Sequence, residues 1–167
     1  MSKPEPFDPL LRFAEIERLV SKIYFRFSHL FLVQPELRDF WWEMAREEEQ
    51  HACILHACRA VIEHYEGERL DLDVGRDKAR ELSAWLEAFL AQGSASLNIE
   101  EAFRIALQIE GSEIDAVYSK LIHLGGPQIA TTMENLGVPA SVQRQKLKAA
   151  LRRFCANPEL LAAAERL

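Results

Sequence analysis

Apolar residues recur at every third or fourth position through most of this 167-residue chain. This spacing is typical of α-helices that bury one face. No segment alternates apolar and polar residues with the period of two that a strand requires, and glycine is scarce, at seven residues. We therefore predict an all-α fold, a four-helix bundle with connecting pieces, in one domain that spans residues 1–167.

Capping residues predict where the helices begin. Asp8 and Asn157 each precede a proline, the usual order of N-cap and first helical residue, and Asn98 with Glu101 forms a capping box. We predict helices at about 9–31, 35–65, 77–92, 98–124, 127–136, 139–155 and 158–167. The helix at 77–92 is an extra element in the connection between the second and third long helices. Residues 1–7 and 66–76 are predicted to be an arm and a loop.

The apolar stripe of the second long helix contains a carboxylate and an imidazole at its centre. This stripe consists of Trp41, Met44, Glu48, His51, Leu55, Cys58 and Ile62. Burying a charged group without a partner costs free energy, so the Glu48-x-x-His51 pair requires an explanation. Spacing of three residues places both side chains on adjacent turns of one face, where both can reach the same metal ion.

Carboxylates also interrupt the stripes of the first and third long helices, at Glu17, Glu110 and Glu113. Four carboxylates and an imidazole in an apolar interior would destabilise the fold unless a cation lay between them. Oxygen donors with imidazole suit iron or manganese, and zinc is also possible. The neighbouring Glu47 and Glu49 are expected to face solvent.

Simpler interpretations exist for single members of this set. Glu17 would be a surface residue if the phase of its helix were shifted by one position. His51 would be an ordinary core histidine if a backbone carbonyl accepted its N–H, and Glu113 also fits a solvated edge position.

Taken together, these motifs resemble the ferritin-like superfamily, specifically its rubrerythrin type. Glu17 is followed seven residues later by Tyr24, as in the first helix of that family. The segment 48–52, Glu-Glu-Gln-His-Ala, is similar to the second-helix motif. The segment 110–113, Glu-Gly-Ser-Glu, with Tyr118 five residues after it, is similar to the third-helix motif. The resemblance covers residues 8–155, and the third-helix match is its most specific part.

The resemblance implies a role for each acid. Glu17 would be a terminal ligand, Glu48 a bridging ligand and His51 the histidine of the first metal. Glu110 would serve the second metal, and Glu113 would be the additional ligand typical of rubrerythrins. By the same resemblance we expect iron as the cofactor, a homodimer, and an external electron donor for any oxidoreductase or peroxidase activity.

The fourth long helix departs from the family pattern. The family repeats Glu-x-x-His there, whereas Gln143 and Lys146 occupy the corresponding positions of this chain, and no cysteine-rich electron-transfer module is present. The Lys146 ammonium is expected to pair with Glu48 or Glu110 in place of a lost cation. Our hypothesis is a degenerate site that holds one ion, through Glu17, Glu48, His51 and also Glu113, or none.

Two alternatives remain open at this stage. One is an intact di-iron oxidase or peroxidase, in which an unidentified residue completes the second site. The other is a metal-free helical scaffold or interaction protein. Peroxide turnover after iron loading would favour the first, and stability unchanged by chelator or added metal would favour the second.

Composition narrows the partners and the compartment. A net charge of -6 argues against nucleic acid, and no apolar run is long enough to span a bilayer. The three cysteines form no C-x-x-C pair, so we expect a reducing cytoplasm. Trp41 and Trp42 cannot both face one side of a helix, so one of them is expected at the surface, where a dimer contact could cover it.

Overall fold

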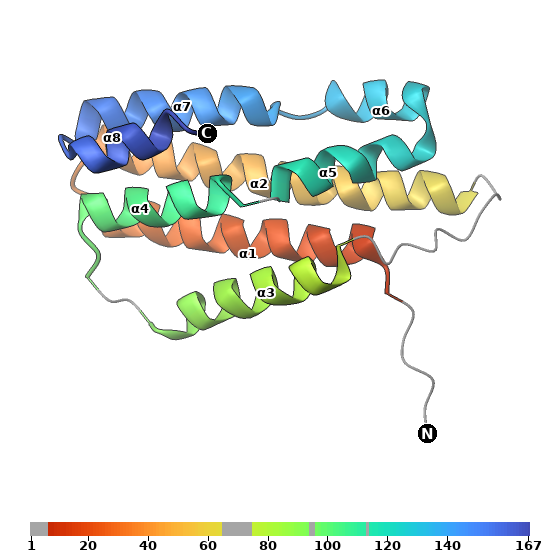
Figure 1. Ribbon diagram of the computed structural model, residues 1–167, viewed down its shortest axis with the longest axis horizontal. Coiled ribbons are helices and arrows are strands. Elements are labelled where there is room, and N and C mark those ends of the chain that lie inside the picture. The colour runs from red at the N-terminus through yellow and green to blue at the C-terminus, as the bar shows by residue number, and fades with distance from the viewer. Residues whose placement is uncertain (1–6, 65–74, 94–95, 113) are drawn as a thin grey trace.

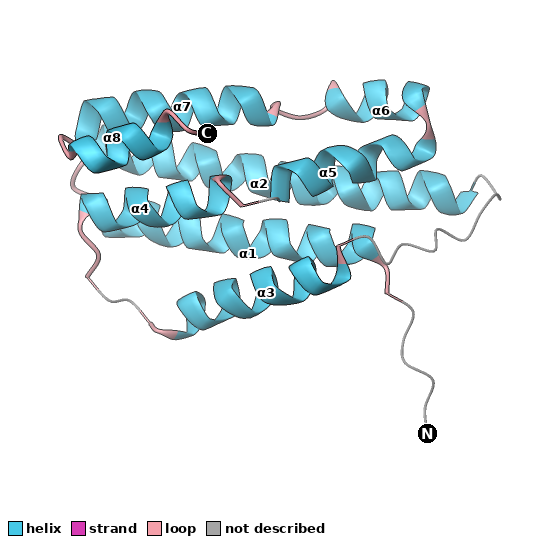
Figure 2. Ribbon diagram, viewed as in Figure 1, coloured by secondary structure: helices cyan, strands magenta, loops and turns pink. Residues whose placement is uncertain are grey.

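The computed structural model describes residues 7–64, 75–93, 96–112 and 114–167, and within these ranges it contains helices and no strand (Figure 2). The predicted all-α class is therefore confirmed. The helices are α1 (Pro9–Leu30), α2 (Pro35–His64), α3 (Arg76–Ala91), α4 (Ile99–Glu110), α5 (Ile114–Ile122), α6 (Pro127–Glu134), α7 (Ala140–Phe154) and α8 (Pro158–Ala164), with a 3-10 turn, η1, at His123–Gly125.

The helices form four roughly parallel rows (Figure 1). Helices α1 and α2 are the first two rows and pack against each other along their length. Helices α4 and α5 follow one another in the third row, and α6 and α7 do so in the fourth. Helix α3 packs on the outer side of α1, and α8 packs against α4 and α7. The extra helix and the short C-terminal helix lie close to their predicted boundaries.

The third long helix is not continuous, which corrects the prediction of one helix from 98 to 124. Helix α4 ends at Glu110, where the backbone N–H of Gly111 closes the last turn on the carbonyl of Leu107 at 2.9 Å. The Ser112 hydroxyl donates to the carbonyl of Ile109, and such local bonds compete with helix continuation. The chain then resumes as α5, whose first residue is Ile114.

An aromatic cluster around Trp41 fills one part of the core. The Trp41 ring lies 5.6 Å from the ring of Tyr24, and 5.0 Å from the rings of both Phe27 and Phe103. Trp41 is fully buried, whereas its neighbour Trp42 is 43% exposed. The prediction that one of the two tryptophans faces outward is confirmed.

The predicted arm and loop lie almost wholly in residues 1–6 and 65–74, outside the described residues. At the end of that loop, Gly75 has φ of 89°, a left-handed conformation that glycine adopts without strain. No helix in the described part of the chain has the length and apolar content needed to cross a membrane.

The capping box of α4 has a measurable consequence. The Asn98 side chain accepts from the backbone N–H of Glu101 at 2.9 Å, and the Glu101 carboxylate accepts from the N–H of Asn98 at 2.8 Å. We expect Asn98→Ala to lower the free energy of unfolding by about 1 kcal/mol in urea denaturation, and Asn98→Gly to cost only a few tenths as much. Equal losses in both variants would show that the side-chain bond contributes nothing.

Candidate metal centre

Three of the predicted ligands converge in the interior. Glu17 of α1 and Glu48 and His51 of α2 each offer one donor atom, and these atoms all lie within 4.8 Å of one another. These residues are 1%, 4% and 2% exposed, respectively. The residues belong to the buried faces of α1 and α2, which is where the apolar periodicity predicted them. We call these three residues the buried triad.

Both ring nitrogens of His51 face hydrogen-bond acceptors. Nδ1 lies 3.3 Å from Oε2 of Glu48, and Nε2 lies 3.0 Å from the carbonyl oxygen of Val138, in the link between α6 and α7. Only an imidazolium can donate from both nitrogens. Burial lowers the pKa of His51, but the contacts with Glu48 and Val138 outweigh it and raise the pKa to about 9. Without an ion, His51 therefore neutralises Glu48.

Glu17 is the member of the buried triad whose carboxyl group has no positively charged partner among the described residues. Burial raises the pKa of its carboxyl well above the ordinary value, and the charge of Glu48 and a hydrogen bond to Glu48 raise it further. Its Oε1 atom is buried and has no hydrogen-bond partner within the part of the chain that the structure describes. Two adjacent buried carboxyl groups, one with an unpartnered oxygen, form a site at which a cation would remove both penalties.

Glu110 lies at the end of α4 and is buried, as predicted, but it is not part of the buried triad. The Tyr24 hydroxyl donates to its Oε1 atom at 2.6 Å. Burial raises the pKa of Glu110 well above the ordinary value, as do the charges of Glu48 and Asp115, while the Tyr24 hydrogen bond lowers it. Glu113, the other predicted ligand on this row, lies outside the described residues.

The sequence reasoning missed Asp115, which lies just after the break between α4 and α5. Arg144 of α7 donates to its Oδ2 atom from Nη2 at 2.8 Å and from Nε at 3.2 Å. Burial raises the pKa of the Asp115 carboxyl, the Arg144 hydrogen bond lowers it, and the charge of Glu48 raises it. Asp115 lies off the inner face predicted for this row, so the periodic pattern gave no reason to select it.

Helix α7, in the fourth row, contacts the buried triad through the side-chain amide of Gln143. Gln143 of α7 is completely buried, and its Nε2 atom donates to Oε1 of Glu48. Lys146 pairs with Glu47, so its predicted pairing with Glu48 or Glu110 is wrong. Glu47 is only 7% exposed, which also corrects its assignment to solvent, whereas Glu49 is exposed as predicted.

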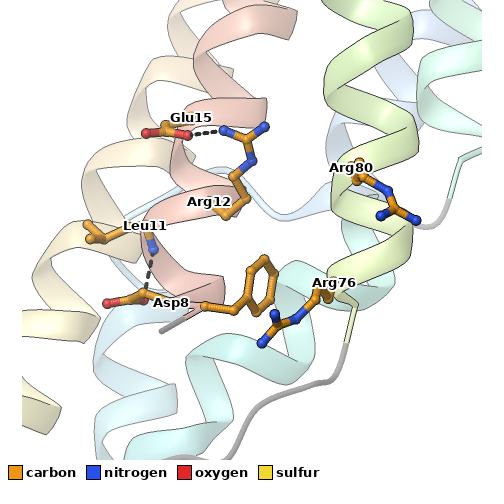
Figure 3. A pocket seen from close by; sticks show the side chains of 7 residues that line it. Asp8, Leu11, Arg12, Glu15, Arg76 and Arg80 are labelled. Carbon is orange, nitrogen blue, oxygen red and sulfur yellow. Dashed lines mark hydrogen bonds and ion pairs between the residues drawn. The ribbon is translucent and has the colours of Figure 1, made fainter. Parts of the chain in front are cut away.

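A separate polar pocket of about 430 Å³ lies between the first turns of α1 and α3 (Figure 3). No residue of the buried triad lines it. Arg12 in this pocket pairs with Glu15 at 2.7 Å, and the guanidinium group of Arg76 lies over the Phe7 ring at 4.9 Å. Two further charged side chains of this pocket, Asp8 and Arg80, pair with Arg59 and Asp77 outside it.

Comparison with known protein families, with curated proteins and with solved structures gives no match for this chain. The functional argument therefore depends on the residues and geometry described above.

Proposed function

We propose that this protein binds one divalent transition-metal ion through Glu17, Glu48 and His51, in a ferritin-like, rubrerythrin-type bundle. The observation that carries the proposal is the convergence of three buried donor atoms within 4.8 Å, one of them on the carboxyl group with the unpartnered Oε1 atom. Carboxylate and imidazole donors suit iron first, with manganese or zinc as alternatives.

Charge supports one ion better than two. Glu48 and Glu17 would supply two negative charges, which one divalent cation balances. Glu110 is hydrogen-bonded to Tyr24 and stands outside the buried triad, and Lys146 adds a positive charge to the helix from which a second histidine would come. These features favour the degenerate site over the intact di-iron centre.

The proposal is tested by metal content and stability. Protein purified without added metal, stripped with chelator and titrated with Fe²⁺ under anaerobic conditions should bind one equivalent per chain. Its melting temperature should rise with ion concentration, because an ion that binds only the folded state stabilises it. Binding of two equivalents would support the di-iron oxidase or peroxidase instead.

The metal-free scaffold is favoured by one specific observation, the pairing of both His51 nitrogens with acceptors in the absence of an ion. Ion binding must displace a proton from one of these nitrogens, so it should release protons and weaken as pH falls. Absence of any ion uptake at pH 7 to 8, with an unchanged melting temperature, would establish the scaffold.

A further inference from the structure

Gln143 has an unpartnered amide oxygen beside the buried triad. The side chain is completely buried and its Nε2 atom donates to Oε1 of Glu48, but its own Oε1 atom has no hydrogen-bond partner among the described residues. Both atoms belong to one planar amide group, so the unpartnered oxygen also lies close to the Glu48 carboxylate. Buried carbonyl oxygens are normally satisfied, and an orphan one beside clustered carboxyls is an atom to which a cation or a water molecule would bind.

We infer that Oε1 of Gln143 is a further ligand of the bound ion, and that this neutral ligand sets the charge of the site for a single divalent cation. The inference rests on the proposed function. Amide oxygens bind hard and intermediate divalent ions much as carboxylate oxygens do, but they carry no charge. Gln143 would thus ligate the ion through its oxygen while its nitrogen remains bonded to Glu48.

This arrangement completes the donor set from three rows of the fold. Helix α1 contributes Glu17, α2 contributes Glu48 and His51, and α7 contributes Gln143. A carboxylate at position 143 would add a negative charge that a second divalent ion could balance, whereas the amide does not. The same residue therefore supplies a ligand and limits the number of ions.

The competing role for Gln143 is that of a positioning residue, which orients Glu48 by hydrogen bonding and never touches the ion. Loss of such an outer partner also weakens metal affinity, so affinity alone does not separate the two roles. The coordination sphere of the ion does separate them, because only a ligand changes it.

The experiment uses the full chain with Co²⁺ as the probe, in wild type, Gln143→Leu, Gln143→Glu and the matched control Gln145→Leu. Gln145 lies on the same helix but is exposed. Wild type and Gln145→Leu should bind one equivalent with the same visible absorption spectrum. Gln143→Leu should bind at least about tenfold more weakly and with an altered spectrum.

Gln143→Glu keeps an oxygen donor at this position, which provides a test if the leucine variant fails to fold. It should bind Co²⁺ at least as tightly as wild type. A wild-type spectrum in Gln143→Leu, or weaker binding by Gln143→Glu, would overturn the inference while leaving the proposed function intact. Absence of Co²⁺, Fe²⁺, Mn²⁺ and Zn²⁺ binding by wild type would instead overturn the proposed function, and the inference with it.

Discussion

Glu17→Gln is expected to make the metal-free protein more stable at neutral pH and to lower its ion affinity at least about 100-fold. The pKa of Glu17 in the folded state is raised well above its unfolded value, chiefly by burial and then by Glu48. Below the unfolded pKa of about 4.3, Glu17 is protonated in both states and does not lower the stability of the fold. As pH rises from there toward the folded pKa, the buried carboxyl lowers the free energy of unfolding progressively. Glutamine cannot ionise, and its amide can still donate to Glu48.

Glu17→Gln should raise the stability of the metal-free protein and lower its ion affinity. A residue needed only for packing would not show this combination, so the two measurements distinguish a binding role from a packing role. Urea denaturation after chelation, at pH 4 and pH 7, should show an advantage for the variant at pH 7 that shrinks toward pH 4. Iron titration should show the loss of affinity. Glu15→Gln, on the same helix but exposed, is the matched control and should change neither property. A Glu17→Gln variant that is less stable than wild type at pH 7 would refute the prediction that the buried carboxyl destabilises the metal-free protein.

The buried triad was predictable because a single helix face determines each of its members. Glu17, Glu48 and His51 lie at positions where the apolar period of three to four residues predicts burial, and the structure places all three inside. Helix ends marked by proline or asparagine were predictable for the same reason, since the capping chemistry is local.

The features that sequence reasoning missed depend on which neighbour a helix meets. Helix α2 packs against α1 and also against α7, so its buried face is wider than one stripe and includes Glu47. A periodic pattern predicts the centre of a buried face but not its width. Asp115 was missed because it lies beside the predicted inner face of its row, and its pairing with Arg144 depends on the position of α7.

The pairing of Glu47 with Lys146 leads to the second large effect. Lys146→Met should lower the free energy of unfolding by about 2 kcal/mol, because it leaves a buried carboxylate without its counter-charge. The expected loss is smaller than for a fully buried pair, since the Lys146 side chain is 38% exposed and water screens it. The second oxygen of Glu47 has no hydrogen-bond partner among the residues that the structure describes, so Lys146 supplies the side-chain contact shown for this carboxylate.

A second, compensating substitution tests whether the effect comes from the unpaired charge of Glu47. Adding Glu47→Leu to Lys146→Met should return the unfolding free energy to within about 1 kcal/mol of wild type, because an apolar pair replaces the ion pair. Lys148→Met, on the same helix, is the control for loss of a lysine. Ion stoichiometry should stay at one in all three proteins, since neither Glu47 nor Lys146 belongs to the buried triad. Glu17 would then govern ion binding and Lys146 would stabilise the contact between α2 and α7, two separable functions of buried charge in one fold.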